Sequence, residues 1–100
     1  MKVPFSYLKW QFADPDRIWR DVKKVVLSGD FTLGKEVAEF EGKFAKAIGT
    51  RYAVGVNSGT DALFLSLKAL GIGHGDEVIT MTSTFIATAG AIAASGARPV

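Results

Sequence analysis

The second half of the chain alternates short apolar runs with helical patterns, and this alternation constrains the fold more than any other feature. Residues 52–56 and 77–80 have the length and composition of buried strands, while residues 61–70 and 86–94 have those of helices. Residues 97–100 have the pattern of another strand as it opens. Strand, helix, strand, helix, strand predicts βαβ units. We therefore expect an α/β fold with a mostly parallel sheet that is covered by helices on both faces.

The first half of the chain predicts two helices joined by a loop. Asp14 and Pro15 are typical of an N-cap and a first helical position, and the apolar spacing after them predicts a helix that Gly29 ends. A second apolar stripe predicts a helix over about residues 35–48, with Gly49 as its C-cap.

Length and composition predict one globular unit at most. A chain of 100 residues with 48% hydrophobic content can bury a core. The strand that opens at residues 97–100 has nothing after it to pair with, so we expect these residues to be the front part of a longer fold. Residues 1–50 then form an N-terminal helical arm and loop, and residues 51–100 begin a larger α/β domain.

Charge and composition exclude several functional classes. The 12 basic and 10 acidic side chains give a net charge of +2 and are spread along the chain, which argues against nucleic-acid binding. No apolar run is long enough to span a bilayer and no signal peptide opens the chain, so we expect a cytoplasmic protein with no membrane partner. Without cysteine, thiolate chemistry is excluded, and no metal site is predicted. The single histidine, His74, lies in a turn composition and is not predicted to be catalytic.

The junction between residues 52–56 and the following helix predicts an anion-binding site. The first N–H groups of a helix have no partner within it, and the helix dipole places partial positive charge there. Gly59 allows close approach of a ligand, and Ser58 and Thr60 add hydroxyl donors for a phosphate. A helix start capped by Asn57 or Ser58, with no ligand, explains the same residues equally well.

The predicted topology adds an aromatic residue to this site. Ligands of open α/β sheets bind beyond the carboxyl ends of the strands, where both residues 57–60 and residues 82–85 would lie. Phe85 is therefore placed to stack on a flat ring whose phosphate the first loop holds. The alternative is that Phe85 packs into the core at a helix start.

Several blocks of the sequence together resemble the DegT/DnrJ/EryC1/StrS group of sugar aminotransferases. The resemblance covers almost all residues from 4 to 100, with the blocks in the order and at the spacing of that family. The blocks are Gly29-x-Phe-Thr-x-Gly34, Val37-x-x-Phe-Glu41, Ala53-Val-Gly-Val-Asn-Ser-Gly-Thr60-x-Ala-Leu63, Gly71-Ile-Gly-x-Gly-Asp-Glu-Val-Ile79, Thr84-Phe85-x-Ala-Thr88 and Gly96-Ala-x-Pro99. The family uses pyridoxal 5′-phosphate in the aspartate-aminotransferase, or type I, fold.

The resemblance implies a cofactor role for four residues. Ser58, Gly59 and Thr60 match the loop that holds the cofactor phosphate, and Phe85 matches the aromatic that stacks on the pyridine ring. Both assignments agree with the reading from the residues themselves.

The resemblance also implies roles for the first half of the chain. The loop that contains Phe31 and Thr32 matches one that lies near the sugar substrate, although an ordinary interhelix loop remains as good an explanation. In this family the N-terminal segment helps to form a homodimer, which implies interface roles for Pro4, Phe5, Tyr7, Leu8 and Trp10.

The implied reaction moves an amino group from an amino-acid donor, usually glutamate, to the ketone of a nucleotide-linked keto-sugar. The cofactor supplies the electron sink. In the family, the Schiff-base lysine and the aspartate that pairs with the pyridine nitrogen both lie after the position of Val100. No residue of this segment is therefore predicted to be catalytic.

Other functions remain compatible with these residues. Some relatives lack the Schiff-base lysine and act as sugar dehydratases, and others make aminated aromatic or cyclitol precursors. A different alternative is a non-enzymatic phosphate-binding α/β module or a dinucleotide-binding unit. The dinucleotide alternative lacks Gly-x-Gly-x-x-Gly after a strand, since the glycines from Gly71 to Gly75 follow a helix.

Overall fold

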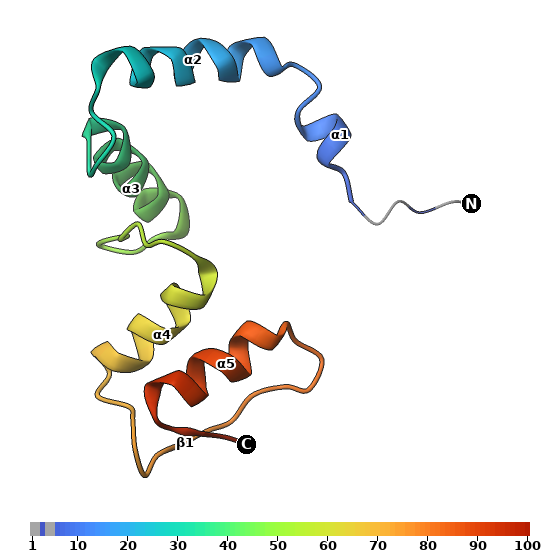
Figure 1. Ribbon diagram of the computed structural model, residues 1–100, viewed down its shortest axis with the longest axis vertical. Coiled ribbons are helices and arrows are strands. Elements are labelled where there is room, and N and C mark those ends of the chain that lie inside the picture. Colours follow the sequence, from blue (N-terminus) through green and yellow to red (C-terminus); the bar gives the residue numbers. More distant parts are fainter. Residues whose placement is uncertain (1–2, 4–5) are drawn as a thin grey trace. The chain divides into compact units, whose positions relative to one another are not determined.

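The computed structural model describes residues 3 and 6–100, which form two compact units, Met1–Ala53 and Val54–Val100 (Figure 1). The predicted interface residues Pro4 and Phe5 lie outside the described residues. No helix in the described ranges is long and apolar enough to cross a membrane.

The first unit contains helices α1 (Leu8–Gln11), α2 (Pro15–Ser28) and α3 (Lys35–Ile48). Helix α2 begins at Pro15 after the N-cap Asp14, and the left-handed Gly29, with a φ of 71°, ends it. Helix α3 has the predicted bounds, and Gly49 ends it with a φ of 73°. Both predicted helices are confirmed. The short helix α1 was not predicted.

Most large apolar side chains in the described part of the first unit are exposed. Ala45 on α3 is buried, whereas Phe40 and Phe44 stack on each other with ring centroids 5.6 Å apart and stay accessible. The loop before α3 is tightly folded. Leu33 has a φ of 51°, and a Cβ at Gly34 would come within 2.7 Å of the Asp30 carboxylate.

The second unit contains helix α4 (Gly59–Ala69), strand β1 (Glu77–Val78), helix α5 (Ile86–Ser95) and strand β2 (Arg98–Pro99). The two strands pair in parallel, with Glu77 opposite Arg98 and Val78 opposite Pro99. Thr80 N–H donates to the carbonyl of Val100 at 2.8 Å, so pairing extends one step past β1. The order strand, helix, strand with parallel pairing is the βαβ unit that the sequence predicts.

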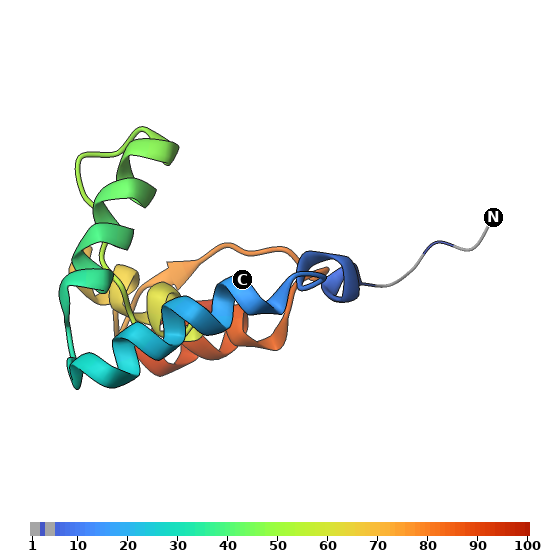
Figure 2. The same ribbon diagram turned by 90° about the horizontal axis from the view of Figure 1, so that it is seen from above.

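Helix α5 supplies most of the core of the second unit. Ala91 and Ile92 on α5 are buried, as is Ala97 in the turn before β2. Helix α4 packs beside α5. Figure 1 shows the two helices running in the same direction, and Figure 2 shows the same pair from above in yellow and in orange to red.

The prediction of a strand at residues 52–56 is wrong for this structure. No strand is assigned there, and the side chains of Tyr52 and Val54 are 76% and 77% exposed. A strand needs a neighbour with which its backbone groups can pair. Within the described residues the one sheet is β1 with β2. The local sequence shows that these residues are apolar, but it does not show whether another strand lies beside them to pair with.

Candidate functional site

The start of helix α4 is fixed by a serine cap. Ser58 is the N-cap in an extended conformation, and its Oγ accepts a hydrogen bond of 3.1 Å from the backbone N–H of Asp61. The carbonyl of Ser58 accepts from Ala62 N–H at 2.9 Å, which is the first helical bond. Of the two cap residues considered, Ser58 and not Asn57 therefore performs this role.

This cap leaves several donors for a ligand. The Ser58 oxygen uses a lone pair to accept from Asp61, so its hydroxyl proton stays available to donate. Among the described residues, the N–H groups of Gly59 and Thr60 have no acceptor. A Cβ built at Gly59 would meet nothing within 4 Å, so the backbone there is open to approach. Unpaired N–H groups and hydroxyls at the positive end of a helix fit the oxygens of a phosphate group.

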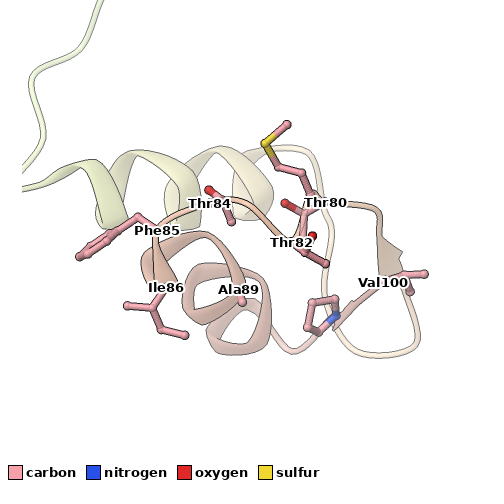
Figure 3. A pocket seen from close by; sticks show the side chains of 9 residues that line it. Thr80, Thr82, Thr84, Phe85, Ile86, Ala89 and Val100 are labelled. Atoms are coloured by element: carbon pink, nitrogen blue, oxygen red, sulfur yellow. The ribbon is translucent and has the colours of Figure 1, made fainter. Parts of the chain in front are cut away.

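The aromatic residue lies at the start of helix α5. Phe85 is the N-cap in an extended conformation, and its side chain is 76% exposed. Figure 3 shows its ring pointing away from the other labelled side chains. A hollow of about 270 Å³ borders the same loop; its lining residues are Thr80, Met81, Thr82, Thr84, Phe85, Ile86, Ala89, Pro99 and Val100. Within the described residues, Phe85 is therefore not packed into the core.

Helices α4 and α5 bring these two features to one end of the second unit. Because the helices run in the same direction, their first turns lie toward the same end (Figures 1 and 3). Ser58 and Thr60 come from the first turn of α4, and Phe85 from that of α5. The predicted phosphate-binding residues and the predicted stacking residue thus lie toward the same end of the second unit.

The other predicted site residues belong to the first unit. Phe31 is 69% exposed, and Thr32 is also exposed, in the loop between α2 and α3. A local hydrogen bond stabilises the start of this loop: the Asp30 backbone N–H donates to Ser28 Oγ at 3.2 Å. The two side chains are therefore presented to solvent by a structured loop.

One contact near the site was missed by the sequence interpretation. The hydroxyls of Thr84 and Thr88 are hydrogen-bonded, with 2.9 Å between their Oγ1 atoms, and either can be the donor. The only signal in the sequence is the spacing of four residues, and it is a weak one because Thr84 lies before the N-cap Phe85 and so outside the helix. Within the described residues no group of His, Asp and Glu side chains could hold a metal ion.

Comparison with known proteins identifies the family. The DegT/DnrJ/EryC1/StrS aminotransferase family matches residues 14–100. The chain belongs to this family. The members of the DegT family that it resembles include the dTDP-3-amino-3,4,6-trideoxy-alpha-D-glucose transaminase of Streptomyces venezuelae, 47% identical over 99% of this chain and 26% of that protein. They also include the UDP-2-acetamido-2-deoxy-3-oxo-D-glucuronate aminotransferase of Pseudomonas aeruginosa, 44% identical over 98% of this chain and 28% of that protein.

A solved structure supports the same fold. The NtdA protein of Bacillus subtilis, whose structure has the cofactor PMP bound, superimposes with a TM-score of 0.88 at 36% identity, over 99% of this chain and 23% of that one. The fold is that of the N-terminal part of aminotransferases of this group, as the sequence predicts. The chain spans about a quarter of the length of the curated relatives it matches.

Proposed function

We propose that these residues form the N-terminal part of a pyridoxal 5′-phosphate-dependent aminotransferase that transfers an amino group from glutamate to the ketone of a nucleotide-linked sugar. One observation carries the proposal: unused donors at Ser58, Gly59 and Thr60 lie toward the same end of the second unit as the exposed ring of Phe85. Membership of the DegT family supports the same reaction class.

The residues present fit the cofactor. Its phosphate would accept hydrogen bonds from the N–H groups of Gly59 and Thr60 and from the hydroxyls of Ser58 and Thr60. Its pyridine ring would lie against the face of Phe85, which has no ring partner among the described residues. When bound, the cofactor acts as the electron sink that amine transfer needs.

The role of this segment would be to bind the cofactor and to orient its ring. The dipole of α4 would attract the negative charge of the phosphate, and the hydroxyl of Ser58 has a fixed position because it also caps the helix. A ring stacked on Phe85 is restricted to one plane, which lowers the entropy cost of reaching a reactive geometry. Within the described residues we assign no proton transfer to any side chain.

The names of the relatives narrow the substrate. The relative from Streptomyces is named for a 3-amino sugar linked to dTDP, and that from Pseudomonas for a 3-oxo sugar linked to UDP. We extend to this protein a substrate with the ketone at the third sugar carbon, joined to a nucleoside diphosphate. Both nucleotides occur among the relatives, so the base of the nucleotide is not part of the proposal.

The remaining roles follow from the family. The loop residues Phe31 and Thr32 would contact the sugar substrate, and the exposed Tyr7, Leu8 and Trp10 would contribute to a homodimer. Tyr7 and Trp10 already contact each other, with ring centroids 5.9 Å apart. We place the enzyme in the cytoplasm.

The direct test is cofactor uptake and amine transfer by the full-length protein. Purified protein is titrated with pyridoxal 5′-phosphate and followed by the absorbance of the bound chromophore. Loaded protein is then given glutamate and a dTDP- or UDP-linked 3-keto-sugar. We expect an amino sugar and 2-oxoglutarate in equal amounts. Absence of the chromophore would contradict the cofactor assignment, and loss of a sugar oxygen without gain of nitrogen would contradict the transferase assignment.

The phosphate site has its own variants. Thr60→Ala removes a hydroxyl donor, and we expect cofactor binding to weaken by about 1–3 kcal/mol because a phosphate oxygen loses a partner. Thr60→Ser keeps the hydroxyl and is the matched control. Equal affinity in the wild type and Thr60→Ala would remove Thr60 from the site.

A further inference from the structure

The start of helix α5 lacks the side-chain cap that helices usually carry. Its N-cap is Phe85, whose side chain has no oxygen to accept a bond from the first turn, and no side-chain cap bond forms. Ser, Thr, Asp and Asn are preferred at this position because they satisfy such N–H groups. An aromatic there gives up this stabilisation, so the backbone around the ring needs another support.

Thr88 makes one backbone and one side-chain hydrogen bond to the residues at this helix start. Its N–H donates to the carbonyl of Phe85 at 3.0 Å. Its side chain is hydrogen-bonded to Thr84, with 2.9 Å between the two Oγ1 atoms. Thr88 therefore holds the residue that carries the ring and also the residue before it. Thr88 is half-buried and borders a hollow together with residues of α4, whereas Thr84 and Phe85 are exposed, so the support comes from the packed side of the helix.

The direction of the Phe85 ring is not set by neighbouring side chains. The side chain is 76% exposed and stacks on no other ring among the described residues, so packing does not fix it. Figure 3 shows Thr84 beside Phe85 at the end of the loop, with the ring extending from the helix start. A side chain that is not held by neighbours takes its direction from its own backbone dihedrals.

We propose that Thr88 is a positioning residue: through its hydrogen bond to Thr84 it sets the backbone at Phe85, and so the plane in which a cofactor ring can stack. The inference rests on the proposed cofactor role of Phe85. It adds a residue that would not touch the cofactor. Thr84 and Thr88 would act as one pair, in which each hydroxyl matters only while the other is present.

The test compares four variants of the full-length protein. Thr88→Val and Thr84→Val each remove one hydroxyl at nearly constant volume, the double variant removes both, and Thr88→Ser keeps the hydroxyl. Thr50→Val is the chemical control, because it removes a hydroxyl that donates to the carbonyl of Tyr52 at 3.0 Å in the first unit.

The first measurement uses protein without cofactor. Hydrogen–deuterium exchange of the peptide that covers residues 82–88 reports directly on the loop. We expect faster exchange in Thr88→Val and Thr84→Val, and wild-type exchange in Thr88→Ser and Thr50→Val. Because the hydroxyls act as a pair, the double variant should be no faster than either single one. Unchanged exchange in Thr88→Val would overturn the proposal.

The second measurement uses protein titrated with pyridoxal 5′-phosphate. We expect Thr88→Val to bind about 3- to 10-fold more weakly and to change the circular dichroism of the bound chromophore, while Thr88→Ser stays within about 2-fold of the wild type. Equal loss in Thr88→Ser and Thr88→Val would overturn the role of the hydroxyl. If the wild type takes up no cofactor, the proposed function fails, while the exchange measurement still decides whether Thr88 holds the loop.

Discussion

The carboxylate of Asp76 accepts a hydrogen bond of 2.8 Å from the backbone N–H of Gly73, which closes the turn that leads into β1. The Asp76 N–H donates back to the carbonyl of Gly73 at 3.1 Å, and the Asp76 carbonyl accepts from Arg98 N–H at 2.9 Å. Asp76 therefore closes the turn through Gly73 and also connects it to strand β2 through Arg98.

Replacing this carboxylate should destabilise the turn. We expect Asp76→Ala to lower the free energy of unfolding by about 1 kcal/mol, because Gly73 N–H loses its acceptor at an exposed site. Asp76→Asn keeps an acceptor oxygen and should lose less. Urea denaturation of the full-length protein measures both. The exposed side chain of His74 in the same turn serves as control, and a loss in His74→Ala equal to that in Asp76→Ala would contradict the role of the carboxylate.

Two glycines with nearly the same backbone conformation should differ in tolerance. Gly96 and Gly75 have φ values of 94° and 93°. A Cβ at Gly96 would lie 3.2 Å from the backbone nitrogen of His74, whereas a Cβ at Gly75 would meet nothing within 4 Å. We expect Gly75→Ala to cost about 1–2 kcal/mol from the backbone alone, and Gly96→Ala at least about 1 kcal/mol more. Thermal unfolding of the two variants checks the order, and equal melting temperatures would show that the contact with His74 is unimportant.

The cap at Ser58 can be separated from its proposed role toward phosphate. Ser58→Ala should lower the free energy of unfolding by about 1 kcal/mol, and Ser58→Gly by only a few tenths. Both variants lose the same hydroxyl, so cofactor affinity should fall by a similar factor in each. Stability is read from urea denaturation without cofactor, and affinity from chromophore absorbance. A cofactor affinity that follows stability from one variant to the other would argue that Ser58 acts only as a cap.

The ring of Phe85 should matter for binding and not for folding. We expect Phe85→Leu to weaken cofactor binding by about 0.5–1.5 kcal/mol beyond the loss of contact area, because stacking is lost. The side chain is 76% exposed, so the melting temperature without cofactor should hardly change. Phe85→Tyr keeps the ring and is the control. Wild-type affinity in Phe85→Leu would remove Phe85 from the site.

An ion pair on α2 gives a prediction on pH. The Lys24 ammonium donates a hydrogen bond to Asp21 and attracts its charge, which holds the Asp21 pKa below its ordinary 3.8. A lowered folded-state pKa contributes stability that is present above 3.8 and is lost as pH falls through the folded value. Both side chains are exposed, so the contribution is small.

The measurement for this pair is an NMR titration of the Asp21 carboxyl carbon. Lys24→Met should return the Asp21 pKa toward 3.8. Lys43→Met, which removes the corresponding partner of Glu39 on α3, should leave it unchanged. An Asp21 pKa that does not respond to Lys24→Met would mean that the pair is not formed in solution.

Local signals in the sequence predicted the helices well. Pro15, Gly29 and Gly49 act through their own backbone preferences, so they mark helix ends without help from the rest of the fold. Helix α1 has no such marker and spans four residues, and its aromatic contact between Tyr7 and Trp10 is not visible as a pattern.

Strand pairing and side-chain geometry could not be predicted from the sequence. The apolar run at residues 52–56 has strand composition, yet a strand exists only beside another, and that information is not local. The βαβ order did predict that the starts of α4 and α5 share one end, since chain direction alone fixes it. The bond between Thr84 and Thr88 depends on side-chain torsions, which the sequence leaves open.

The absence of a polar cap at the start of α5 has a practical consequence for anyone who wishes to alter this protein. Because Thr84 and Thr88 support that turn, the side chain at position 85 contributes little to the stability of the fold. Position 85 should therefore tolerate substitution by other aromatic residues. If Phe85 has its proposed stacking role, tyrosine, tryptophan or an unnatural aromatic introduced there should tune the electronic environment of a bound ring, with no compensating redesign of the helix.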